Sequence, residues 1–101
     1  MPTYFAKTFA HNSGVCHYVI RRSGGKFSSA WRVWVTGSLD KFAPHVDDVF
    51  AGRYDGYSTS DRRKVFRQNH GWSAGKVHST MPEPWWDDKA LARLGYRRME
   101  W

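Results

Sequence analysis

The first third of the chain shows the two-residue periodicity of antiparallel strands. Residues 3–10, 15–22 and 29–36 are rich in aromatic and β-branched side chains, and positions two apart share a face. In the third run one face carries Trp31, Val33 and Val35, and the other carries Ala30, Arg32 and Trp34. Asn12-Ser13-Gly14 and Ser23-Gly24-Gly25-Lys26 separate the runs and favour tight turns. The pattern predicts a three-stranded meander.

The next segment changes to helical spacing. Ser38 is a suitable N-cap, and Gly52 a suitable stop, for an amphipathic helix over Leu39 to Ala51. Its apolar arc consists of Leu39, Phe42, Ala43, Val46, Val49 and Phe50. Pro44 removes a backbone donor inside this pattern, which allows the helix to begin near Ala43 after a short turn.

Two further helices are expected in the second half. Ser58 or Ser60 can cap a mostly polar helix that runs to about His70, with Val65 and Phe66 inward. Trp86 to Leu94 forms the third helix, with an inner stripe of Trp86, Ala90, Leu91 and Leu94 and a stop at Gly95. Residues 71–81 are irregular or a weak strand, and 96–101 alternate like a last strand.

Together these elements predict the α+β class. We expect a small antiparallel sheet of three or four strands packed against two or three short helices, in a single domain of residues 1–101.

Charge is distributed unevenly along this fold. The 101 residues include 16 Lys and Arg against nine Asp and Glu, a formal net charge of +7. Residues 1–39 and 62–82 each carry five basic side chains and no acidic one, whereas 40–61 carry five aspartates against two basic side chains. Packing can therefore present a strongly positive face, as nucleic-acid-binding proteins do.

Basic side chains also alternate with aromatic ones, which favours a nucleic-acid interface, because Lys and Arg hold phosphates and exposed rings stack on unpaired bases. The predicted phosphate contacts are Arg21, Arg22, Lys26, Arg32, Arg62, Arg63, Lys64 and Arg67, with Trp34 as the stacking group. The competing interpretation places Trp31 or Trp34 in the core and leaves the arginines as solvated surface. The pattern does not separate DNA from RNA.

The alternative function is a protein-binding module, such as a small inhibitor or accessory subunit of a larger complex, one that handles nucleic acid included. Six tryptophans and ten arginines match the residue types that dominate interface hot spots. The stiff segment 82–86 can present Trp85, whereas Trp86 lies on the apolar arc of the third helix.

Other chemistry finds little support in the sequence. Cys16 is the single cysteine, and the five histidines lack the paired spacing of zinc sites, so we expect no metal and no cofactor. The pairs Asp47-Asp48 and Asp87-Asp88 diverge on a helix, and no nucleophile, base and orienting group converge, so we expect no enzyme. The absence of a signal peptide and of a membrane-length apolar run predicts a cytoplasmic protein without membrane contact.

Overall fold

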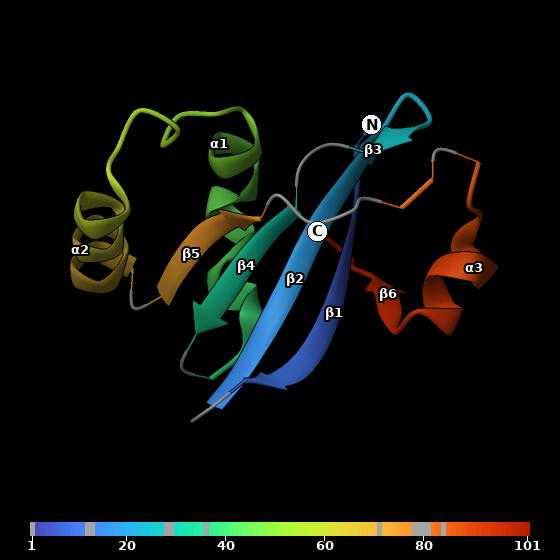
Figure 1. Cartoon of the computed structure of the whole chain (residues 1–101), viewed down its shortest axis with the longest axis horizontal. Helices are drawn as coiled ribbons and strands as arrows, with labels where there is room; N and C mark the ends of the chain where they lie inside the picture. Colours follow the sequence, from blue (N-terminus) through green and yellow to red (C-terminus); the bar gives the residue numbers. More distant parts are fainter. Residues whose placement is uncertain are drawn as a thin grey trace.

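The computed structural model describes residues 2–11, 14–27, 30–35, 37–70, 72–77, 82–83 and 85–101. Its centre is a six-stranded antiparallel sheet in the order β5-β4-β2-β1-β6, with β3 paired to β2 (Figure 1). The strands are β1 (Thr3–His11), β2 (Gly14–Ser23), β3 (Lys26–Phe27), β4 (Ala30–Val35), β5 (Trp72–Val77) and β6 (Tyr96–Arg98). The α+β class and the antiparallel pairing are as predicted.

The predicted number of strands, three or four, is too low. β3 has only two residues and forms because Gly24 and Gly25 adopt positive φ angles of 58° and 77° in the turn after β2. β5 arises from a segment that reads as irregular or a weak strand, since Trp72–Val77 contains few β-formers. It is held by pairing along its whole length with β4, a tertiary interaction that local propensity does not encode.

The helix predicted over Leu39 to Ala51 is wrong as one continuous element. The segment folds as two 3₁₀ turns, η1 (Leu39–Lys41) and η2 (Ala43–His45), followed by α1 (Val46–Phe50). Pro44 explains the break, because it removes a backbone donor in the middle of the run. The cap is confirmed, since the Ser38 hydroxyl accepts a 3.2 Å hydrogen bond from the Asp40 amide. The predicted arc is buried except for Ala43, which is half-buried.

The other two helices lie close to their predicted positions. α2 (Thr59–His70) is capped by Ser58, whose hydroxyl accepts from the Asp61 amide at 3.1 Å, while the side chain of Phe66 lies outside the described part. α3 (Asp88–Arg93) is shorter than expected and begins at an Asp87 cap. Leu94, expected on the inner stripe, is 42% exposed, because the helix ends before it.

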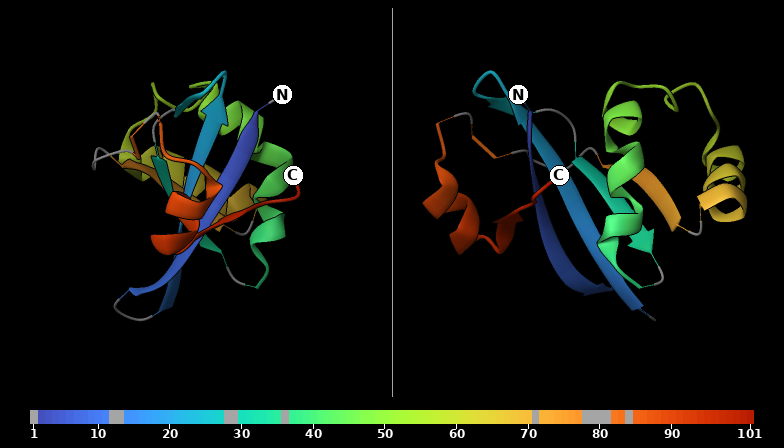
Figure 2. Two further views of the ribbon diagram at one scale, coloured as in Figure 1. Left: turned by 90° about the vertical axis from the view of Figure 1, so that its right-hand side faces the viewer. Right: turned by 180° about the vertical axis from the view of Figure 1, so that it is seen from behind.

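Both faces of the sheet carry a core. The first face, seen in front in the right panel of Figure 2, packs under η1, η2 and α1, and its buried strand residues include Tyr4, Ala6, Val19, Trp31 and Val33. The second face faces the viewer in Figure 1, and its smaller core places Phe5, Ile20 and Ala30 against Leu91 of α3. Within the described ranges, no helix is long and apolar enough to cross a membrane.

Candidate nucleic-acid interface

The second face carries a group of aromatic and basic side chains beside its small core, and one of them, Tyr96, packs against that core. We call it the aromatic–basic surface, and it consists of Lys7, Phe9, Tyr18, Arg32, Trp34 and Tyr96, all of them half-buried. These residues come from β1, β2, β4 and β6. Their common face follows from strand alternation, because positions two apart point the same way.

Strand register brings four of these residues into one row. Lys7 is paired with Tyr96 on one side and with Tyr18 on the other, and Tyr18 is paired with Arg32. The row continues to Gly75 of β5, the partner of Arg32. A Cβ atom placed on Gly75 would meet nothing within 4 Å, so the sheet is open beside Arg32. The row therefore crosses the sheet from one edge strand to the other.

Arg32 lies at the centre of the ring contacts. Its guanidinium carbon is 5.5 Å from the centroid of Tyr18 and 5.7 Å from that of Trp34, which are cation–π distances. Its Nη2 donates a 3.2 Å hydrogen bond to the Tyr18 hydroxyl. The Phe9 ring stacks on Tyr18 with centroids 4.5 Å apart, and Lys7 Nζ lies 5.9 Å from the Tyr96 centroid. The cations and rings therefore hold one another in place.

The charge on this surface is not neutralised by its own residues. None of the six is acidic, and within the described ranges the structure records no ion pair for Arg32. Arg32 Nε is buried and has no hydrogen-bond partner there. Burial, with a smaller effect of Tyr18, raises the pKa of Tyr96, so that its ring stays neutral at physiological pH. The surface is positive and aromatic.

The buried thiol of Cys16 belongs to the same face of β2. Burial raises its pKa, and the nearby charge of Arg32 only partly opposes this effect. Cys16 is therefore a neutral packing residue beneath the surface.

Two of the predicted contacts, Arg32 and Trp34, meet on this surface. Arg22 shares the second face but lies near α3, where it pairs with Asp88 at 2.8 Å. Arg21 lies on the first face with its guanidinium carbon 5.4 Å from the Phe50 centroid, and Lys26 is exposed on the β3 hairpin.

The remaining predicted cations belong to α2, which packs beside β5 (Figure 1). Arg63 and Lys64 are exposed there, whereas Arg62 is half-buried with its guanidinium carbon 5.4 Å from the centroid of the Trp31 ring. Arg67 falls within α2, but its side chain lies outside the described part of the structure. The predicted cations therefore fall into two groups, one on the strands β2, β3 and β4 and the other on α2.

The structure also settles which tryptophans are accessible. Trp31 is 1% exposed in the first core, whereas Trp34 is half-buried on the second face. Trp85 is 76% exposed, and Trp86 packs partly against the second core.

Sequence reasoning missed Lys7, Phe9, Tyr18 and Tyr96 as site residues. Their alternation was visible in the sequence, since Lys7 and Phe9 share a face of one strand and Tyr18 faces outward on the next. The missing information was the register that aligns them with Arg32.

Comparison with protein-family models, with curated proteins and with solved structures finds no match. Among the described side chains, no three His, Cys, Asp or Glu residues gather in a way that could hold a metal ion.

Proposed function

We propose that this protein is a non-catalytic nucleic-acid-binding protein that holds a single strand on the aromatic–basic surface. Half-buried rings on a sheet give unpaired bases a stacking platform, and cations between the rings meet the phosphates. The row from Tyr96 to Arg32 supplies both kinds of group on one face.

The observation that carries the proposal is the state of Arg32. A half-buried guanidinium without a carboxylate partner loses solvation and gains no ion pair in return. Among the described residues its buried Nε–H has no hydrogen-bond partner, and its guanidinium lies within cation–π distance of Tyr18 and Trp34. An incoming phosphate would supply the counter-charge that the half-buried guanidinium lacks, and its oxygens match the planar fork of guanidinium donors.

The direction of the row across the sheet suggests the path of the bound nucleic-acid strand. The distance from β6 to β5 is about 19 Å at the usual spacing of adjacent strands, and α2 lies next to β5. A single nucleic-acid strand that lies along the row would leave the sheet toward Arg63 and Lys64, which are exposed. On this path, the α2 cations predicted from the sequence would contact the same nucleic-acid strand.

The direct test is a titration of labelled single-stranded and duplex oligonucleotides at two salt concentrations. We expect tighter binding of the single strand, because paired bases cannot stack on the rings, and we expect affinity to fall steeply with salt. Equal affinity for duplex and single strand would reject the stacking platform, and no binding at low salt would reject the function. DNA and RNA versions of each oligonucleotide establish which of the two is preferred.

A second candidate function, protein binding, is favoured by the surroundings of Trp85. This ring is 76% exposed and is followed by an apolar hollow of about 210 Å³ between Trp86, Ala90, Arg93 and Leu94. Tryptophan is enriched at interface hot spots, and exposed apolar surface often marks a protein-binding site. Loss of a co-purifying protein on Trp85→Ala, with oligonucleotide binding unchanged, would support this candidate.

A further inference from the structure

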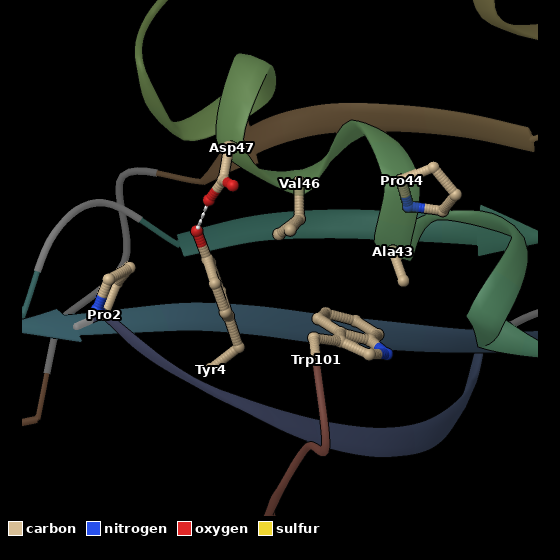
Figure 3. A pocket seen from close by; sticks show the side chains of 7 residues that line it. All are labelled: Pro2, Tyr4, Ala43, Pro44, Val46, Asp47 and Trp101. Atoms are coloured by element: carbon tan, nitrogen blue, oxygen red, sulfur yellow. Dashed lines mark hydrogen bonds between the residues drawn. The ribbon is translucent and has the colours of Figure 1, made fainter.

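A second hollow lies on the first face, away from the aromatic–basic surface. Its volume is about 560 Å³, within the range of small-molecule sites. It is lined by Pro2, Tyr4, Ala43, Pro44, Val46, Asp47 and Trp101, which come from the start of the chain, the η2–α1 segment and the last residue (Figure 3). It is therefore assembled from three segments that are distant in the sequence.

Two aromatic rings form part of the wall. The centroids of Tyr4 and Trp101 are 5.9 Å apart at an interplanar angle of 51°, so the rings are tilted toward each other. Trp101 is held by an edge contact with Phe42, at 6.0 Å, and by a 3.4 Å hydrogen bond from its indole N–H to Asp40. Two prolines, Ala43 and Val46 make the rest of the lining apolar.

Asp47 carries the only charged side chain among the seven lining residues. Asp47 accepts a hydrogen bond from the Tyr4 hydroxyl, and its side chain has no ion pair recorded within the described part of the chain (Figure 3). Arg21 of β2 is a cation that interacts with Tyr4, and it does not line the hollow. Burial and the Asp47 hydrogen bond raise the pKa of Tyr4 to about 12, so the phenol remains a neutral donor.

These features select the chemistry of an occupant. The half-buried ring of Trp101, with a carboxylate at one side, attracts a cation, and the apolar walls, to which the 4% exposed Tyr4 belongs, accept methyl groups. A primary ammonium needs acceptors for three N–H groups, whereas the lining offers one carboxylate that already accepts a hydrogen bond. A quaternary ammonium has no N–H group and therefore needs no hydrogen-bond acceptor. The hollow is thus negative and aromatic in a chain whose net charge is +7.

We propose that the hollow between Tyr4, Asp47 and Trp101 binds a quaternary ammonium group. The group can belong to a free small molecule or to a trimethylated lysine side chain of a partner, because both present the same methylated cation. This site is independent of the proposed nucleic-acid surface, which lies on the opposite face of the sheet.

The test compares choline with its uncharged tert-butyl analogue, in which carbon replaces nitrogen. Binding is followed by the indole N–H resonance of Trp101 in proton–nitrogen correlation spectra of the full chain. We expect choline to bind at least about tenfold more tightly than the analogue, because shape is equal and only the charge differs. Equal affinities, or no movement of the Trp101 resonance with either choline or a trimethyllysine peptide, would overturn the proposal.

Two variants test whether the carboxylate of Asp47 attracts the bound cation. Asp47→Asn keeps an acceptor for the Tyr4 hydroxyl and should weaken choline binding about tenfold. Asp48→Asn is the matched control, because Asp48 is exposed, pairs with Arg53 at 3.0 Å and does not line the hollow, so binding should be unchanged. Unchanged binding in Asp47→Asn would overturn the proposal, and the comparison of choline with its analogue decides the case if that variant does not fold.

A final pair of titrations identifies the source of the cation. A trimethyllysine peptide that binds more tightly than choline, and more tightly than its unmethylated form, would support a partner side chain. Choline binding without a gain from the peptide would support a free ligand.

Discussion

Arg32 and Tyr18 are paired across β4 and β2, and the Arg32 guanidinium donates a 3.2 Å hydrogen bond to the Tyr18 hydroxyl. The same guanidinium lies over the rings of both Tyr18 and Trp34. The hydroxyl is a neutral acceptor, so this bond orients the cation and leaves its charge unbalanced. That combination distinguishes Arg32 from Arg22, whose charge is balanced by Asp88.

The two tryptophans of β4 should respond differently to substitution. Trp31→Ala removes a ring that is 1% exposed in the first core and should lower the free energy of unfolding by ~3–5 kcal/mol. Trp34→Leu keeps apolar volume on the half-buried side and should cost only about 1 kcal/mol. Urea unfolding of both variants measures this difference.

Trp34→Leu should instead weaken oligonucleotide binding. Loss of one stacked base is worth about 1–3 kcal/mol, which corresponds to at least about a fivefold drop in affinity. A variant that binds as the wild type does would show that Trp34 does not stack on a base.

The cations of α2 should matter only for longer oligonucleotides. Arg63 and Lys64 lie beyond the β5 edge, so a strand of about 4 nucleotides on the row would not reach them, whereas one of about 12 would. The double variant Arg63→Gln/Lys64→Gln should therefore lower affinity, and reduce the salt slope by up to about 2, for the longer strand alone. A loss of the same size for both lengths would contradict this path.

Stability should fall in mild acid because of His17. Burial, with a smaller contribution from the charge of Arg97, lowers the pKa of this imidazole below its ordinary value of 6.5. As pH falls, His17 of the unfolded chain takes up a proton before His17 of the folded protein does. The contribution of the neutral imidazole to the free energy of unfolding is therefore complete above about pH 6.5. It declines below that pH until the folded form is protonated as well. Urea unfolding at about pH 7.5 and about pH 5 measures the decline.

The variant His17→Gln isolates this contribution. It removes the titrating group and should reduce the loss of stability between the two pH values, even though the hydrogen bond of 2.9 Å between Thr8 and the imidazole is lost. An unchanged loss in the variant would assign the pH dependence to other groups.

The sequence predicts the fold well where local signals are strong. The alternation of β1, β2 and β4 and the caps at Ser38 and Ser58 are found as expected. It fails at β5, whose residues Trp72–Val77 become a strand only through pairing with β4. It anticipates the effect of Pro44 only in part, because a short turn does come first but α1 begins at Val46 and not near Ala43. These outcomes depend on tertiary contacts and on a single missing backbone donor.

The candidate site was predictable only in part. Arg32 and Trp34 could be chosen because basic and aromatic residues alternate in their segment. Lys7, Tyr18 and Tyr96 could not be joined to them, because a shift of one residue in register would send each side chain to the other face. Likewise, no sequence pattern joins Tyr4 and Asp47 to Trp101, since three distant segments form that hollow.

The central claim is that the guanidinium of Arg32, which has no ion pair recorded among the described residues, receives a phosphate or base of a single strand. The most direct measurement is the affinity of Arg32→Gln for a single-stranded oligonucleotide over a series of salt concentrations, beside Arg53→Gln, which removes the same charge from an exposed loop position. The account predicts that Arg32→Gln lowers affinity about tenfold or more and reduces the salt slope by about 1, whereas Arg53→Gln leaves both close to wild type. Equal effects of the two variants, or an unchanged slope in Arg32→Gln, would contradict it.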